Sequence, residues 1–398
     1  MSESQKQSPI TIFLAFLKLG LTAFGGPIAH IGFYREAFVE QRQWLDEKTF
    51  AQLLAVCQFL PGPASSQMGF SIGLMKGGWL GAIAAFIAFT LPSALLLFAF
   101  AGFAYLLDGP IGNAIINGLK LVAVAVVAHA VWGMAQKLTP DWPRRGIAAA
   151  ALIILLLVGM AWMQLVVIAL GALLGLWLCK ANPHDPVRGF SLPYGRGFGW
   201  LFLAIFSILL VLSISMMGGH PTPDNLFAAF YQAGALVFGG GHVVLPLLEQ
   251  STVANGWLSP DSFLAGYGAA QAVPGPLFTL STYLGAEINT GLAPGWSALI
   301  ATLAIFLPGF LILLAVLPFW ARLTDSPKAA SAIAGVNAAV VGLLAAALYD
   351  PIFTEGVSNW IDFLIALGGF LILAVLKRSA LWTVLFCVVA AVFISILL

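Results

Sequence analysis

The stretch FLKLGLTAFGG, residues 16–26, recurs as FYQAGALVFGG at residues 230–240. Both copies start with phenylalanine, carry glycine four residues later and end in Phe-Gly-Gly. A second pair of stretches follows in the same order, QFLPGP at residues 58–63 and QAVPGP at residues 271–276. Ordered matches at glycine, proline and glutamine over such a length indicate two homologous halves.

Further matches extend the repeat along the chain. They are Trp44-Leu45 with Trp257-Leu258, Leu91-Pro92 with Leu307-Pro308, and Gly118 with Gly335. We therefore expect a first repeat at residues 1–185, a linker and one extra helix at 186–219, and a second repeat at 220–398.

The composition determines the surroundings of the chain. Of 398 residues, 61% are hydrophobic and 8% are charged, whereas a soluble domain averages about 25% charged residues. Apolar runs of roughly 20 residues recur, which is the length of a membrane-spanning helix, and the short alternating segments of a barrel do not. The sequence predicts an all-α polytopic membrane protein in a lipid bilayer, without cofactor, metal or nucleic-acid partner. It leaves open whether the chain forms a homo-oligomer.

The basic residues predict the orientation. We expect spans near 77–107, 112–136, 146–161, 162–180 and 198–217, and then near 295–320, 330–350, 358–376 and 380–398. Lysine and arginine fall on alternate loops between these spans, and such loops face the cytoplasm. The N-terminus is then cytoplasmic and the C-terminus lies outside. Five spans separate the two motif regions, so the second repeat is inverted relative to the first.

The motif regions allow two interpretations. Two plain spans at 10–34 and 49–75 would place Arg35, Arg42 and Lys48 outside, against the charge rule. Re-entrant hairpins that turn at FGGP and LPGP would keep these residues and Lys76 in the cytoplasm. A helix at 10–23 would measure about 21 Å, which does not cross the bilayer. Ordinary spans kinked at proline are the alternative.

The breaks themselves indicate a function. Non-helical backbone at membrane depth is tolerated where it is buried in protein or lines a water-filled cavity. A break also creates helix N-termini, which attract anions. Paired broken helices in inverted repeats are typical of secondary transporters that work by alternating access.

Polar side chains surround the breaks. Hydroxyls and amides follow both PGP motifs and suit an oxygen-rich anion, although they could also cap their own helices. His30 and His242 lie just beyond the glycine breaks and could carry charge near neutral pH or serve as packing residues. Lys120 could neutralise an anion or pair with an internal acid, and Glu287 could carry a proton or lie at the outer surface.

Four motifs together, FGGPIAHIG, QFLPGPASSQ, FGGGHVVLP and QAVPGPLF, resemble the chromate ion transporter family in its long form with two fused domains. The resemblance implies a protein of the cell inner membrane that exports chromate, a tetrahedral dianion close to sulfate in shape. Pro27 of the first motif corresponds to Gly241, so the two breaks should not be equivalent. The candidate substrate-binding residues are Phe24, Gly25, Gly26, Pro27, His30, Gln58, Pro61, Gly62, Pro63, Ser65, Ser66, Gln67, Phe238, Gly239, Gly240, Gly241, His242, Gln271, Pro274, Gly275, Pro276, Thr279 and Ser281.

Other functions stay open at this point. A carrier of sulfate or another oxyanion, or a passive anion channel, would use the same broken helices. An enzyme is not expected, because no cluster of acids, nucleophiles or metal ligands occurs in the apolar spans. No G-x-x-x-x-G-K-[ST] loop occurs either, so uphill transport should draw on an ion gradient, by class the proton motive force.

Overall fold

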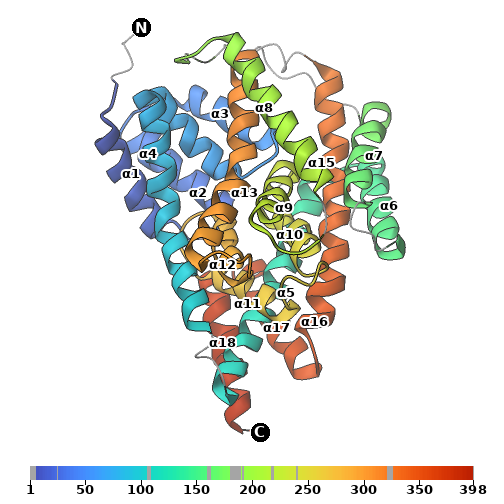
Figure 1. Ribbon diagram of the computed structural model, residues 1–398. Coiled ribbons are helices and arrows are strands. Elements are labelled where there is room, and N and C mark those ends of the chain that lie inside the picture. The colour runs from blue at the N-terminus through green and yellow to red at the C-terminus, as the bar shows by residue number, and fades with distance from the viewer. Residues whose placement is uncertain are drawn as a thin grey trace.

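The computed structural model describes residues 6–24, 26–104, 109–158, 163–179, 190, 192–216, 219–238, 241–320 and 326–397. In this part of the chain the regular structure is helical throughout (Figure 1). Six of its helices are long and apolar enough to cross a membrane. They are α4 (Ala64–Ala104), α5 (Pro110–Leu138), α8 (Arg196–Ser215), α13 (Pro294–Val316), α15 (Pro327–Ala347) and α18 (Ala380–Leu397). The chain is an all-α polytopic membrane protein, as predicted.

Shorter helices complete the set of expected spans. The apolar ones are α7 (Met163–Leu178) and α17 (Trp360–Ala374), and α6 (Trp142–Val158) lies at the remaining expected position. The extra helix expected near 198–217 is α8. The preceding linker residues 180–189 and 191 lie outside the described part of the chain.

Short helices fill the first motif region. α1 (Pro9–Thr22) begins at Ser8, whose side chain accepts a hydrogen bond from the Thr11 N–H. α2 (Gly26–Arg35) continues into a π-helical turn at Glu36–Gln41, and α3 (Glu47–Phe59) ends before the LPGP loop. Helix α4 then has two limbs, 64–77 and 79–104, which join at Gly78 with φ of 61°. The limbs pack side by side, because a Cβ atom on Gly81 would lie 2.4 Å from the carbonyl oxygen of Gly73.

The ends of these short helices meet at one end of the molecule. The Gln7 N–H donates to the carbonyl oxygen of Lys76 at 2.8 Å, which joins the start of α1 to the end of the first limb of α4. Arg35, at the end of α2, donates to Glu47 at the start of α3 at 2.8 Å. With 14 residues, α1 measures about 21 Å. The chain therefore follows the re-entrant path and not that of two kinked spans.

The second motif region repeats this plan. α9 (Pro223–Leu236) precedes the glycine break, and η3 (Gly241–Val243) with α10 (Val244–Thr252) follows it. α11 (Pro260–Gln271) precedes the VPGP loop, and η4 (Leu277–Thr279) with α12 (Leu280–Glu287) follows. Ser262, near the start of α11, donates to Glu287 at the end of α12 at 3.4 Å. This pair of hairpins also enters and leaves at one end.

Helix α8 shows where the two ends lie. Its 20 residues span about 30 Å, close to the thickness of the hydrocarbon core. Just before it, the ring of Tyr194 lies 5.5 Å from that of Trp79, which follows the first limb of α4. Near its other end, Ser213 lines a cavity together with Asn255 and Trp257, between α10 and α11. Residues at the opening of the first pair of hairpins thus lie near the start of α8, and residues at the opening of the second pair lie near its end.

The C-terminal helices of each half pack against the other half. α5 packs against α17 and α18, whereas α15 packs against α6 and α7. The aligned glycines lie at these crossings. A Cβ atom on Gly118 would lie 2.7 Å from the Cα of Val388, and one on Gly335 would lie 2.5 Å from the Cα of Gly175. Equivalent residues thus make equivalent close contacts in the two halves.

Candidate transport site

The two PGP loops cross to the opposite half. The Gly62 N–H donates to the carbonyl oxygen of Val237 at 2.8 Å, and the Gly275 N–H donates to that of Ala23 at 3.0 Å. Ala23 and Val237 occupy the same position in the two repeats, immediately before the Phe-Gly-Gly breaks. The loop of each half is therefore bonded to the break of the other half. We call residues 61–63 and 274–276 the crossed loops.

Close backbone approach explains the glycine in each crossed loop. Gly62 has φ of 116° and Gly275 has φ of 104°, a region that favours glycine. A Cβ atom on Gly62 would lie 2.8 Å from the Cα of Gly309, and one on Gly275 would lie 2.8 Å from the Oγ of Ser93. Ser93 and Gly309 directly follow the aligned prolines inside α4 and α13. The flanking prolines of both loops are buried; they are Pro61, Pro63, Pro274 and Pro276.

Gln67 joins its own crossed loop to the second half. Its Nε2 donates to the carbonyl oxygen of Pro61 at 2.9 Å and to that of Gly309 at 2.8 Å. Its Oε1 is buried without a partner. Both N–H groups are therefore used within the protein, and the structure gives this side chain a positioning role.

His30 lies against the other crossed loop. Its ring is fully buried on α2, and Nε2 lies 3.1 Å from the carbonyl oxygen of Ala23. Because a carbonyl only accepts, Nε2 is the nitrogen that donates. The same oxygen also accepts from Gly275. Nδ1 has no partner, and the ring meets Phe89 edge-on with 5.3 Å between centroids.

The hydroxyls after the breaks divide into two groups. Thr279 donates to the carbonyl oxygen of Pro276 at 2.7 Å, so it stabilises its own loop. The side chains of Ser65, Ser66 and Ser281 are buried. The Oγ atoms of Ser66 and Ser281 have no partner. Capping thus accounts for Thr279 and leaves these two hydroxyls available to a ligand.

The second half places its polar motif residues differently. The Nδ1 of His242 lies 2.7 Å from the hydroxyl of Tyr267, and Gln271, one turn later on α11, also interacts with that hydroxyl. The Nε2 of Gln271 is buried without a partner, whereas its sequence counterpart Gln58 is exposed. The two glutamines are therefore not equivalent, in keeping with the expected inequality of the two breaks.

The remaining motif residues lie at the breaks themselves. Phe24 and Phe238 are half-buried, and Gly241 is buried at the start of η3. Gly26 has φ of 77° with open space where a Cβ atom would stand. Gly25, Gly239 and Gly240, and the ring of Pro27, lie outside the described part of the structure.

Comparison with known proteins identifies the family. The sequence model of the chromate transporter family matches this chain twice, at residues 10–176 and 225–392. The chain belongs to the chromate transporter family. The two matches lie on either side of α8 and cover most of both repeats.

Curated relatives agree with this membership. A probable chromate transport protein of Synechococcus elongatus is 29% identical over 340 residues, which is 84% of this chain and 82% of the relative. A chromate transport protein of Pseudomonas aeruginosa is 26% identical over 356 residues, covering 85% and 80% of the two chains. One of Cupriavidus metallidurans is 26% identical over 342 residues, covering 85% and 81%. No solved structure matches the chain.

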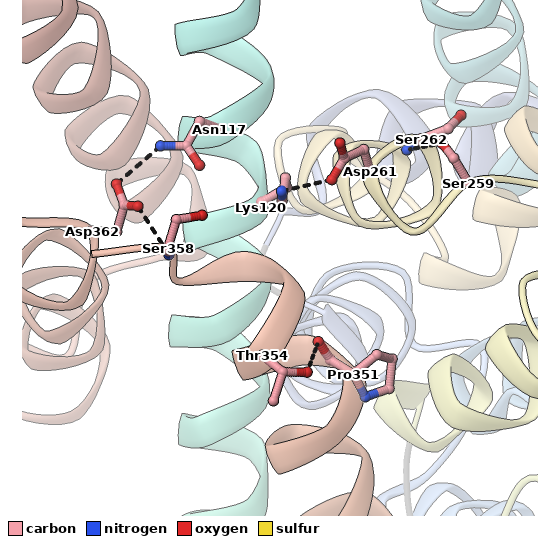
Figure 2. Close-up of polar contacts among 9 residues, drawn as sticks. All are labelled: Asn117, Lys120, Ser259, Asp261, Ser262, Pro351, Thr354, Ser358 and Asp362. Atoms are coloured by element: carbon pink, nitrogen blue, oxygen red, sulfur yellow. Dashed lines mark hydrogen bonds and ion pairs between the residues drawn. The ribbon is translucent and has the colours of Figure 1, made fainter. Parts of the chain in front are cut away.

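The two candidate charged residues lie away from the crossed loops. Lys120 of α5 pairs with Asp261 at the start of α11, with 2.7 Å between Nζ and Oδ1 (Figure 2). On the same helix, Asn117 donates to Asp362 of α17 at 3.0 Å. Lys120 is thus paired with a carboxylate whose side chain is 64% exposed. Glu287 accepts from Ser262 where the second hairpins open, so neither residue faces the crossed loops of this transporter.

The structure adds site residues that the sequence did not reveal. Tyr34 and Phe89 pack around His30, and Ser93 and Gly309 receive the crossed loops. The alignment of Pro92 with Pro308 is a signal that could have directed attention to the residues after them. Nothing in the sequence distinguishes Tyr34 from other aromatic residues of the chain.

Proposed function

We propose that the chain is a secondary transporter that exports chromate, or a closely related tetrahedral oxyanion, across the cell inner membrane. The observation that carries this proposal is the pair of crossed loops. Each places a non-helical segment of one repeat against the glycine break of the other, and its one N–H group, that of Gly62 or Gly275, donates across the two repeats. Broken helices at mid-depth are where secondary transporters bind their substrates, and family membership supplies the substrate class.

We further propose an inverted repeat that works by alternating access, with repeats at 1–185 and 220–398 and the linker and extra helix at 186–219. Its support is the reciprocity of the contacts, because each crossed loop is bonded to the break of the other repeat. Rocking of one repeat against the other would exchange these contacts. The proton motive force is the proposed energy source, since the sequence has no nucleotide-binding loop.

The proposed orientation follows from the charges at the two ends. Arg35, Lys48 and Lys76 belong to the end where the first hairpins open, and basic loops face the cytoplasm. The N-terminus is then cytoplasmic and the C-terminus lies outside.

A polar cavity supports an exit path at the outer end. It measures about 280 Å³ and is bordered by α8, α9 and α10. Its lining includes amide and hydroxyl side chains: Gln164, Ser213, Asn225, Gln232, Gln250, Ser251 and Asn255. Uncharged hydrogen-bonding groups of this kind can replace the hydration of an anion without holding it tightly.

Transport into inverted membrane vesicles tests the proposed function. With a proton gradient, chromate uptake should be saturable and should exceed the outside concentration, because a carrier works against a gradient. Uptake that stops at equal concentrations would identify a passive channel. If sulfate inhibits chromate uptake as strongly as unlabelled chromate does, the result would favour a general oxyanion carrier. Absence of chromate uptake, with the protein present and monodisperse, would refute the proposal.

A further inference from the structure

In the described part of the chain, six buried polar atoms without partners lie on α2 and α4, two adjacent helices of the first repeat. We group three of these atoms. They are Nδ1 of His30 and the hydroxyl of Tyr34 on α2, and the Oγ of Ser66 on the first limb of α4. We call these three residues the polar cluster. All three side chains are buried, with at most 3% of their surface exposed. Native proteins leave few such atoms unpaired, and each one calls for a water, an ion or a functional reason.

Contacts link His30 with Tyr34 and place Tyr34 against the face of α4 that carries Ser66. His30 and Tyr34 are one turn apart, and their rings lie 5.3 and 5.4 Å from that of Phe89. The Tyr34 hydroxyl lies 3.1 Å from the position that a Cβ atom on Gly69 would take. Gly69 follows Ser66 by one helical turn and therefore lies on the same face of α4. The glycine at this point lets the tyrosine hydroxyl and the ring of Phe16 approach the backbone of α4 closely.

Among the described residues, the second repeat has no equivalent cluster. With the one-residue gap in the alignment, His30 corresponds to Val243 or Val244, and Tyr34 corresponds to Leu247 or Leu248. Thr279, the counterpart of Ser66, donates to its own loop. The side-chain groups available to a ligand around α2 therefore belong to one repeat only.

The hydrogen bond of His30 fixes the chemistry of its free nitrogen. Nε2 donates to the Ala23 carbonyl, so in the neutral imidazole Nδ1 is an acceptor. An acceptor cannot bind a bare anion. It can bind an oxyanion that carries an O–H group, or it can take up a proton and then donate to the anion. In both cases the oxyanion is held together with one proton.

We propose that the polar cluster binds a tetrahedral oxyanion with one proton, which is shared between an anion oxygen and Nδ1 of His30. This inference rests on the proposed transport function. The hydroxyls of Tyr34 and Ser66 donate to two other oxygens of the anion. The proton comes from water, and no bond to the central atom of the anion changes. Chromate accepts a proton near neutral pH and sulfate does not, so the polar cluster selects chromate over sulfate.

Few ionisable groups compete for this proton. On α2 the facing group is Tyr34 itself, and on α3 it is Cys57, which lies near Tyr34. On α4, Phe89 packs against the His30 ring. From the crossed loop, the N–H of Gly275 donates to the same Ala23 carbonyl oxygen as His30. These contacts, which come from described residues, leave His30 as the proton acceptor of the polar cluster.

Calorimetry of the purified full chain tests the proposal. Chromate is titrated in two buffers of different ionisation enthalpy, at a pH where chromate is the dianion. We expect the complex to take up about one proton for each chromate bound. The affinity for chromate should fall about tenfold for each further pH unit. Sulfate at equal concentration should not compete. Binding without proton uptake would overturn the proposal, as would equal competition by sulfate.

Two tyrosine variants separate binding from folding. Tyr34→Phe removes an unpaired hydroxyl, so chromate affinity should fall about tenfold while the melting temperature of the empty protein stays equal or rises. Tyr231→Phe is the matched control, because its buried hydroxyl donates to the Phe206 carbonyl at 3.1 Å. There the melting temperature should fall and the affinity should stay unchanged.

A third variant tests the proton acceptor. His30→Gln should bind chromate without net proton uptake. Normal affinity in Tyr34→Phe, or unchanged proton uptake in His30→Gln, would overturn the polar cluster as the site. Failure of the wild-type protein to bind chromate at all would instead refute the proposed function. The wild-type titration needs no substitution, so the inference stays testable if a variant does not fold.

Discussion

Gly26 and Gly62 have similar backbone conformations but different surroundings. Both have positive φ, 77° and 116°, so alanine at either position adopts a conformation that costs about 1–2 kcal/mol. Only Gly62 has backbone in the way of a side chain, since its Cβ atom would lie 2.8 Å from the Cα of Gly309. The two positions therefore separate conformational strain from close packing.

We predict that Gly62→Ala abolishes chromate uptake into inverted vesicles, because the crossed loop must move away from α13. Gly26→Ala should retain uptake with a modestly lower melting temperature. The comparison requires equal amounts of both variants in the membrane. Loss of uptake in Gly26→Ala at normal stability would contradict this and would indicate that the anion itself occupies the open space beside Gly26.

The residues at the breaks were predictable, but their partners were not. Glycine and proline at membrane depth identify Gly62 and Gly275 from sequence alone. The bond from Gln67 to Gly309 joins residues 242 positions apart, and no periodicity indicates such a pairing. Tyr34 is equally hidden, because a buried tyrosine with a free hydroxyl has the same sequence pattern as one that is fully bonded.

Helix caps determine where the short helices begin. Asp46 accepts hydrogen bonds from the N–H of Thr49 at 2.7 Å and from its hydroxyl at 3.0 Å. The N–H bond holds the pKa of Asp46 below its ordinary value. The ionised carboxylate therefore stabilises the folded state above the ordinary aspartate pKa, and this contribution is lost as the pH falls through the lowered pKa of the folded protein.

Replacing this cap should destabilise the start of α3, which lies at the proposed cytoplasmic end. We predict that Asp46→Ala lowers stability by about 0.5–2 kcal/mol at neutral pH. Asp46→Asn should retain most of the cap at neutral pH. Its contribution to stability should not be lost in acid, because the amide has no carboxylate to protonate. Thermal unfolding of the purified variants across a pH series is the measurement. Equal acid sensitivity of Asp46→Asn and the wild type would assign the pH dependence to another group.

Elements were predictable where the apolar runs are long. The spans expected near 112–136 and 295–320 correspond closely to α5 and α13. The π-helical turn at Glu36–Gln41 carries no comparable signal, because one extra residue shifts the hydrophobic pattern over a single turn only. The division of α4 into two limbs at Gly78 agrees with the span expected near 77–107 and with Lys76 at the turn before it.

At the scale of the whole molecule, the proposed inverted arrangement predicts opposite accessibility for the two sets of hairpins. In a variant without Cys57, Cys179 and Cys387, Asn255→Cys should react with an impermeant maleimide in intact cells. Arg42→Cys should react only after the cells are opened, because both replaced side chains are exposed but lie at different ends. Lys377→Cys, in the last basic loop, serves as a second cytoplasmic position. Labelling of positions 42 and 255 from the same side would rule out the inverted arrangement.

The packing of whole helices could be foreseen only in part. The repeat in the sequence predicts that equivalent helices exist in both halves, and the positions of Gly118 and Gly335 agree with this. The exchange of partners, in which α15 covers α6 and α7, was not predictable. A helix that is apolar all around has no distinct face to indicate its neighbour.

That exchange has a consequence for synthesis on the ribosome. When α7 ends at Leu178, the helix that covers it, α15, begins about 150 residues later in the chain. At translation rates of about 5–20 residues per second, α6 and α7 wait on the order of ten seconds for their partner. During that time their small-residue faces, with Gly171 and Gly175, meet lipid or the insertion machinery in place of Gly335. The first half therefore enters the bilayer before it can reach its final packing, and maturation depends on the last third of the message.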